Sequence, residues 1–192
     1  MNWRIYYRGS LSSCNYACGY CPFAKTRNTR QQLAVDRAQL ERFVDWCKNQ
    51  STPTECQPSL EILFTPWGEA LIHRYYRQAL IELSHLPNIA KVCIQTNLSA
   101  PVGPLSQASP KLTLWATYHP QEVARERFLA QCRRLIQADI GFTVGVVGLK
   151  QHFEEMAALR AEQERRNREE LDDRDSDFVE HEFTDNTYAD RS

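Results

Sequence analysis

The sequence predicts an α/β fold in which parallel strands alternate with helices. Short runs rich in β-branched and aromatic residues recur along residues 1–150, and stretches with apolar residues at helical spacing lie between them. Such alternation is typical of βα units and a parallel sheet. At 192 residues the chain is long enough for one sizeable domain and short for two.

The first βα unit is expected to contain a strand over 3–8, which leads directly into a loop with three cysteines. Asp36 is predicted to cap the following helix, because its short carboxylate can accept backbone N–H groups. That helix has apolar residues at helical spacing, namely Leu40, Phe43, Val44 and Cys47. The sequence 51–53, Ser-Thr-Pro, is expected to end it.

Four more strands are expected, at 60–64, 90–96, 112–117 and 142–147. A helix through Leu71, Tyr75, Ala79 and Leu83 follows the second of them. Five βα units are therefore predicted. Periodicity alone leaves a (βα) barrel and an open doubly wound sheet as alternatives, and in both the active groups gather at the carboxyl ends of the strands.

The end of the chain differs in character from the body. A helix is expected from about Lys150, with Phe153, Met156 and Leu159 on one face, but the following residues are almost all charged or polar. We therefore predict a domain over residues 1–159 and an acidic tail over 160–192 that is a frayed helix or disordered. Residues 178–183 could form a weak strand, but no convincing sixth βα unit is present, so the chain is expected to be shortened at this end.

Charge is divided unevenly between the two parts. Residues 1–150 contain 17 Lys and Arg against 10 Asp and Glu, whereas residues 151–192 contain 6 against 14. An excess this modest does not indicate nucleic-acid binding and is ordinary for a protein with anionic ligands. The sequence has no apolar run of the ~18 residues that a membrane span needs and no signal peptide, so we expect a cytoplasmic protein.

Three cysteines form the most informative motif, Cys14-x3-Cys18-x2-Cys21. Thiolates favour iron–sulfur clusters or zinc. Three thiolates with no obvious fourth partner would leave one iron of a [4Fe–4S] cluster open. A zinc site needs four ligands, and no second cysteine pair is present. The other cysteines are scattered singly and are expected to be buried thiols: Cys47, Cys56, Cys93 and Cys132.

This spacing, with Tyr20 directly before the last cysteine, resembles the signature of the radical S-adenosylmethionine (SAM) superfamily. Within it, the Tyr-Tyr-Arg-Gly opening and the Cys-Pro-Phe-Ala ending resemble a small bacterial subgroup of unassigned substrate. The resemblance implies a partial (βα)6 barrel and a [4Fe–4S] cluster held by Cys14, Cys18 and Cys21. It also implies that the amino and carboxylate groups of SAM chelate the open iron, and that an external flavodoxin or ferredoxin supplies the electron.

The resemblance also assigns residues to SAM. Tyr20 would shield the cluster near the adenine. The segment 65–71, Thr-Pro-Trp-Gly-Glu-Ala-Leu, is similar to the superfamily's Gly-Gly-Glu-Pro segment, so Gly68 and Glu69 would lie at the amino group of SAM. Trp67 and Ala70 replace the first glycine and the proline. From the residues alone, the same segment is better interpreted as a helix start with Glu69 favouring the helix dipole, and only its place after the second strand of a chain with the cysteine loop reverses that preference.

Further candidates follow the later strands. Thr96 and Asn97 resemble the Thr-Asn pair near the SAM ribose and carboxylate, although Thr-Asn is also common turn chemistry. Thr117 could reach the cofactor and the Val147 backbone could pack on adenine, with a core valine as the alternative. Tyr118 and His119 are weak candidates for contacting substrate or moving a proton, and His119 could equally shape the turn before Pro120.

The resemblance therefore predicts a radical SAM enzyme that cleaves SAM reductively and removes a hydrogen atom from an unknown substrate. A non-catalytic iron–sulfur module for electron transfer or partner binding is the alternative. A zinc-stabilised interaction domain is the third hypothesis. Reductive SAM cleavage separates the first from the other two, and iron content separates the second from the third.

Overall fold

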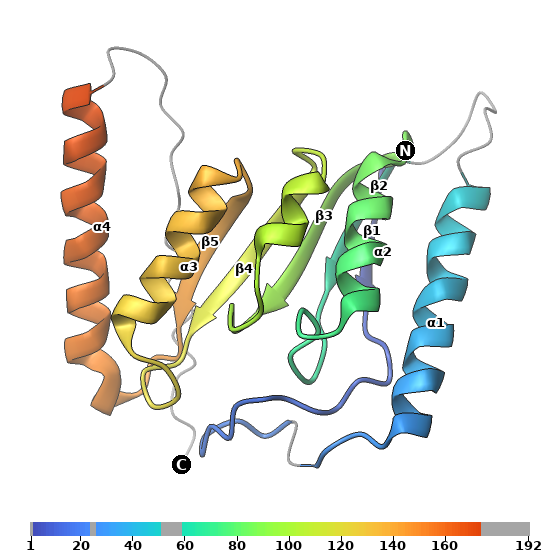
Figure 1. The fold of residues 1–192 in the computed structure, drawn as a ribbon, viewed down its shortest axis with the longest axis horizontal. Coiled ribbons are helices and arrows are strands. Elements are labelled where there is room, and N and C mark those ends of the chain that lie inside the picture. Colours follow the sequence, from blue (N-terminus) through green and yellow to red (C-terminus); the bar gives the residue numbers. More distant parts are fainter. Residues whose placement is uncertain (1, 24–25, 51–58, 174–192) are drawn as a thin grey trace.

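The computed structural model describes residues 2–23, 26–50 and 59–173. Its centre is a five-stranded parallel sheet whose strands lie side by side in chain order (Figure 1). The strands are β1 (Asn2–Tyr7), β2 (Ser59–Phe64), β3 (Ile89–Thr96), β4 (Leu112–Tyr118) and β5 (Gly141–Val146). The predicted α/β class with alternating parallel strands is confirmed, and each predicted strand lies within one residue of the observed bounds.

The helices are α1 (Arg30–Asn49), α2 (Arg74–His85), α3 (Arg125–Gln137) and α4 (Phe153–Asp173), with short 3₁₀ helices η1 (Gly103–Gln107) and η2 (Lys150–His152). Figure 1 shows α2 and α3 in front of the sheet, with α1 and α4 at its two flanks. A sheet in strict chain order needs every crossover to have the same hand, which places the helices on one side. This arrangement is consistent with part of a TIM-like barrel. Within the described residues, no helix is long and apolar enough to span a membrane.

The core lies between the sheet and the helices. Alternate residues of the central strands point into it and are buried: Leu60, Ile62, Phe64, Val92, Ile94, Leu112, Leu114 and Ala116. The pairing of Ile62 with Ile5 on one side and Val92 on the other keeps this face in register across the sheet. The opposite face, which a complete barrel would enclose, is only half-buried at Glu61, Leu63, Cys93 and Trp115.

The third unit differs from the prediction of five βα units. The connection from β3 to β4 contains only the five-residue 3₁₀ helix η1 instead of an α-helix. Pro101, Pro104 and Pro110 explain this, because proline lacks the N–H that an α-helix interior needs. The outer layer is therefore thinner between α2 and α3.

The expected helix cap at Asp36 is wrong. Helix α1 begins earlier, where Thr29 and Gln32 form a reciprocal capping box. Asp36 lies inside the helix and is fully buried. Its carboxylate accepts hydrogen bonds from the hydroxyl groups of Tyr75 at 2.9 Å and Tyr76 at 3.3 Å, so it links α1 to α2.

The last helix also departs from its expected face. Phe153 is 58% exposed, whereas Leu159 is 3% exposed. Two residues six positions apart lie about 120° apart around the helix axis, so Phe153 and Leu159 cannot both face the core. Helix α4 also runs without a break across the predicted boundary at residue 159. The possible strand at 178–183 lies outside the described residues.

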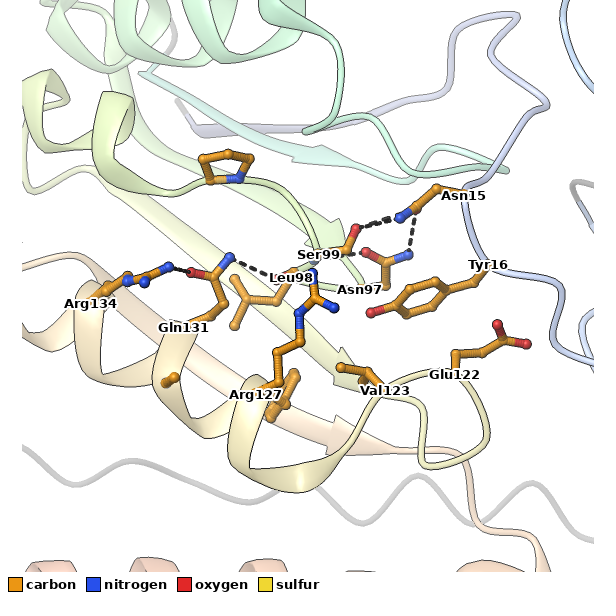
Figure 2. Close-up of a pocket in the computed structure, with 13 residues that line it drawn as sticks. Asn15, Tyr16, Asn97, Leu98, Ser99, Glu122, Val123, Arg127, Gln131 and Arg134 are labelled. Atoms are coloured by element: carbon orange, nitrogen blue, oxygen red, sulfur yellow. Dashed lines mark hydrogen bonds between the residues drawn. The ribbon is translucent and has the colours of Figure 1, made fainter.

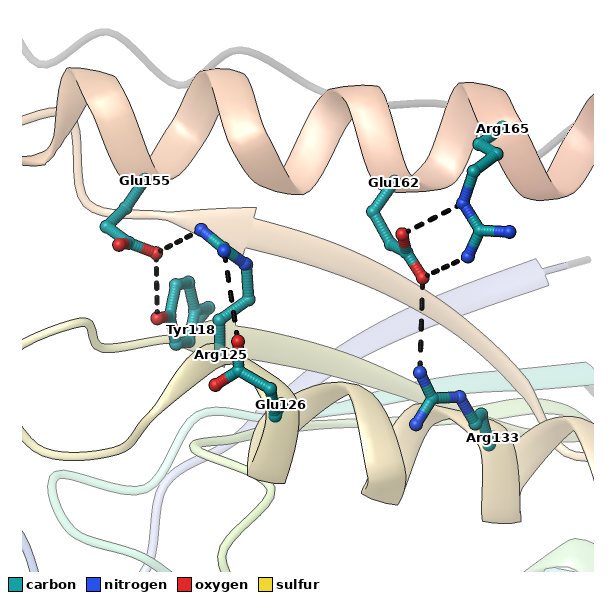
Figure 3. A network of polar contacts seen from close by, with 7 residues as sticks. All are labelled: Tyr118, Arg125, Glu126, Arg133, Glu155, Glu162 and Arg165. Atoms are coloured by element: carbon teal, nitrogen blue, oxygen red, sulfur yellow. Dashed lines mark hydrogen bonds and ion pairs between the residues drawn. The ribbon is translucent and has the colours of Figure 1, made fainter.

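Ion pairs hold α4 along α3 (Figure 3). Arg125 of α3 contacts Glu155 at 3.0 Å, and Arg133 contacts Glu162 at 3.9 Å. The Glu155 carboxylate also accepts a hydrogen bond from the Tyr118 hydroxyl at 3.2 Å. Most of these side chains are substantially exposed, so each pair should contribute less than about 1 kcal/mol.

Candidate functional site

The three-cysteine loop connects β1 to α1 at the carboxyl edge of the sheet. A backbone hydrogen bond from Cys21 N to Cys18 O, 3.1 Å long, closes its tightest turn. Cys18 is buried, and Cys14 and Cys21 are half-buried free thiols. The loop therefore places all three predicted ligands at the edge where parallel α/β proteins gather active groups.

Two N–H groups point at the first of these thiols. Cys14 Sγ lies 3.4 Å from the backbone N of Tyr16 and 3.6 Å from Asn97 Nδ2. Burial raises the pKa of both Cys14 and Cys18. N–H donors favour a sulfur that carries negative charge, so the contacts at Cys14 suit a metal-bound thiolate.

The donor set fits a cluster bound by three thiolates. In a [4Fe–4S] cluster each thiolate binds a different iron, so the sulfurs need not converge on one point. In the described part of the chain, no group of three or more His, Cys, Asp or Glu side chains is arranged to hold one metal ion.

Gly68 lies directly against the cysteine loop. A Cβ at this position would be 1.8 Å from the carbonyl oxygen of Ser13, so only glycine permits the close approach. The backbone N of Glu69 then donates to the same Ser13 oxygen over 3.2 Å. The segment after β2 is therefore fastened to the residue that precedes Cys14.

Trp67 directly precedes Gly68 and lies at the surface. The indole does not enter the core: Trp67 is exposed and stacks on Phe23, with 5.4 Å between ring centroids. The guanidinium carbon of Arg8 lies 5.7 Å from the indole centroid. The bulky side chain thus covers the outside of the cysteine loop.

The carboxylate of Glu69 is 2% exposed and fully engaged. It accepts hydrogen bonds from Thr96 Oγ1 at 2.8 Å, the backbone N of Asn97 at 2.6 Å and the backbone N of Leu71 at 3.0 Å. Burial raises its pKa to about 6, against the opposing effect of these donors. The side chain joins the ends of β2 and β3, and its oxygens face protein donors.

Asn97 connects the end of β3 with the cysteine loop. Its amide donates to Asn15 Oδ1 at 3.1 Å as well as approaching Cys14. The next residue, Leu98, has φ 55°, a left-handed conformation that is costly for a branched side chain. Hydrogen bonds from Leu98 N to Thr96 Oγ1 and from Ser99 N to Asn97 Oδ1, both 3.0 Å long, hold this turn. The turn aims the Asn97 side chain at the loop.

His119, which follows β4, approaches the loop from the other side. Its Nδ1 lies 2.7 Å from the Tyr20 hydroxyl and 3.4 Å from Cys18 Sγ. The rings of Tyr20 and His119 are nearly parallel, with centroids 6.0 Å apart. Burial lowers the pKa of His119 to about 4, so the ring is neutral at pH 7 and Nδ1 can accept a hydrogen bond from the Tyr20 hydroxyl.

The remaining sequence candidates are placed differently. Thr117 lies on the half-buried face of β4, opposite the helix layer. Tyr118 lies in the core, with its hydroxyl on Glu155, and does not join the group around the loop. Val147 follows β5, and its carbonyl accepts a hydrogen bond from His152 Nδ1 at 3.1 Å. His152, which the sequence left unassigned, packs edge-on to Tyr20 with centroids 5.6 Å apart.

A pocket of about 530 Å³ opens beside the cysteine loop (Figure 2). Asn15 and Tyr16 of the loop form one end, the turn after β3 forms a second wall, and α3 forms the third. Arg127 and Arg134 of α3 line it, and Glu122 lies at the loop end. Sequence reasoning missed these residues. The seven-residue spacing of the two arginines was the only available signal.

Comparisons with known proteins add little. No protein-family model and no curated protein matches the chain. The chain is similar to a solved structure described as "Crystal structure of SeMet BtrN in an OPEN conformation", with a TM-score of 0.46 and 14% sequence identity. The match covers 75% of this chain and 56% of that one, so the chain spans little more than half of that protein's length. At this identity and score, the likeness carries no information about the site or the reaction.

Proposed function

We propose that this chain is a radical SAM-type protein that binds a [4Fe–4S] cluster through Cys14, Cys18 and Cys21. When bound and reduced, the cluster would supply the electron for reductive cleavage of SAM. The proposal extends to removal of a hydrogen atom from a substrate and to reduction by an external flavodoxin- or ferredoxin-type donor.

The observation that carries the proposal is the convergence of three chain segments on the cysteine loop. Residues after β2, β3 and β4 each contact the cysteine loop directly, through the Glu69 backbone, the Asn97 amide and the His119 ring. A zinc-stabilised turn would need only its own ligands. Polar groups gathered from several strand ends are typical of a catalytic centre on a parallel α/β scaffold.

The protein's own residues would perform distinct tasks in this site. Asn97 and the backbone of Tyr16 donate toward Cys14 and stabilise its thiolate. Glu69 keeps the β2 and β3 ends together, so the backbone around Gly68 and Asn97 is fixed before a ligand arrives. His119 contacts both the Tyr20 hydroxyl and Cys18 Sγ and so orients the Tyr20 ring at this end of the loop.

The direct test is anaerobic reconstitution with iron and sulfide, followed by EPR of the reduced protein with and without SAM. We expect one [4Fe–4S] cluster whose signal changes when SAM binds, together with formation of 5′-deoxyadenosine. Cys18→Ala should abolish the cluster. Cys93→Ala is the matched control, because Cys93 lies on β3 and not in the loop, and it should retain the cluster.

Two results would contradict the proposal in different ways. Full cluster retention in Cys18→Ala would refute the ligand assignment. A wild-type cluster whose spectrum is identical with and without saturating SAM would favour the non-catalytic electron-transfer module.

A further inference from the structure

The four arginines of α3 fall into two classes. Arg125 and Arg133 point at α4 and form ion pairs with Glu155 and Glu162 (Figure 3). Arg127 and Arg134 line the pocket on another side of the helix (Figure 2). In the part of the chain that the structure describes, neither of this second pair forms an ion pair with a carboxylate. The pocket lining therefore holds two arginines without an ion pair in the described residues, against the one carboxylate of Glu122 at its loop end.

The two pocket arginines share one helix face. They are seven residues apart, which is close to two full turns and about 10 Å along the axis. Arg127 lies nearer the cysteine loop, and Arg134 lies toward the far end (Figure 2). A guanidinium presents planar, paired N–H donors that match a carboxylate or phosphate. The pair thus forms an elongated anion-binding wall.

Arg134 is held in place by a buried partner. Its Nη1 donates to Gln131 Oε1 at 2.7 Å. Gln131 is buried and is itself fixed, because its Nε2 donates to the backbone oxygen of Ala100 at 2.7 Å. One hydrogen bond leaves most of the guanidinium N–H groups able to bind a ligand. Arg134 is itself exposed, so this hydrogen bond restricts the orientation of a side chain that solvent and a ligand can reach.

The other walls suit a small organic molecule. Asn15, Asn97 and Ser99 form a neutral polar group whose members hydrogen-bond to one another, and Leu98 and Phe128 offer apolar surface. A volume of about 530 Å³ is in the usual range for small-molecule sites. The ligand expected here has a polar body and an anionic end.

We propose that this pocket binds the substrate, with its anionic end, a phosphate or a carboxylate, at Arg134 and with Arg127 nearer the loop along the body of the ligand. Identifying the ligand as the substrate rests on the proposed function. In radical SAM proteins the carboxylate of SAM is committed to the open iron at the cysteine loop. An anion at the Arg134 end, beyond Arg127, therefore belongs to a second molecule, whose body extends toward the loop.

The test is an NMR titration of the full chain with inorganic phosphate, and separately with acetate, at constant ionic strength. The Nε–H signals of Arg127 and Arg134 should shift and saturate, while those of Arg125 and Arg133 stay in place. Arg127→Gln combined with Arg134→Gln should weaken binding at least ~10-fold. The matched control, Arg125→Gln with Arg133→Gln, should change it less than about twofold.

Several outcomes would overturn the proposal. Equal shifts of all four arginines would mean general charge attraction, and no saturation with either anion by about 50 mM would mean no site. If phosphate or acetate binds more tightly than the other, the result supports the anion site and identifies the substrate group as a phosphate or a carboxylate, respectively. In reconstituted protein, SAM that displaces the anion would overturn the substrate assignment, whereas simultaneous binding supports it. The phosphate titration needs no cluster, so its failure is distinct from failure of the proposed function.

Discussion

The hydroxyl of Tyr20 lies 2.7 Å from Nδ1 of His119, so the loop that follows β1 is joined to the residue that follows β4. Strands β2, β3 and β4 lie between these two residues in the sequence. The contact joins them at the carboxyl edge of the sheet, beside Cys18. Neither partner is fully exposed, so solvent competes only partly for the hydrogen bond.

This contact should be measurable as a coupling energy. Tyr20→Phe, His119→Ala and the double variant should give a coupling of about 0.5–1.5 kcal/mol in urea unfolding, the usual net value of such a hydrogen bond. Tyr20→Phe combined with His85→Ala is the control, because His85 contacts Gln107 instead. Additive losses at Tyr20 and His119 would show that the contact contributes nothing.

Gly68→Ala should destabilise the protein by about 1–3 kcal/mol, because the added Cβ would overlap the backbone of Ser13, which cannot rotate away. The loop should shift and cluster retention should fall. Gly19→Ala is the matched control within the loop itself, since a Cβ there meets nothing within 4 Å. Urea unfolding and iron content measure both effects, and equal behaviour of the two variants would argue against the close approach.

Glu69 should give stability a defined pH dependence. Its pKa rises from 4.5 in the unfolded chain to about 6 in the folded protein, so the folded state holds the proton more tightly. This contribution is present below pH 4.5, declines between pH 4.5 and 6, and amounts to about 2 kcal/mol. In Glu69→Gln that decline should disappear. The difference between the wild-type and variant unfolding free energies across this window isolates the effect, and a constant difference would contradict it.

Leu159→Ala should destabilise the attachment of α4 by about 2–5 kcal/mol, because the side chain is buried. Phe153→Ala on the same helix should cost less than about 1 kcal/mol, because its ring is mostly exposed. Hydrogen exchange of α4 amides would separate the two variants. If both lose protection equally, ion pairs with α3 and not Leu159 hold the helix.

The strands could be predicted closely because their signal is local. Runs such as Leu60-Glu61-Ile62-Leu63-Phe64 alternate between a buried and a half-buried face, and β-branched residues favour this geometry. The capping box at Thr29 and Gln32 has the Thr-x-x-Gln spacing of this motif, but the prediction placed the helix start at Asp36 instead. Asp36 could not be assigned, because its partners Tyr75 and Tyr76 lie about forty residues away and only packing reveals them.

The site was predictable only in part for a similar reason. Parallel strands end at one edge, so the sequence could indicate that Glu69, Asn97 and His119 would lie near the cysteines. It could not indicate that the Glu69 carboxylate would accept hydrogen bonds from the protein itself, or that the Tyr118 side chain would lie in the core. The four arginines of α3 look alike in sequence, and only the position of α4 distinguishes them.

The short connection between β3 and β4 has a consequence for how ligands could enter. A full crossover helix would lie on the sheet beside α3 and occupy the space above the turn after β3. The prolines limit this stretch to η1, so no such helix covers the turn, and Pro101 lines the pocket. The short connection thus provides a route by which a ligand could enter the pocket, and lengthening this connection would be the simplest way to close that route.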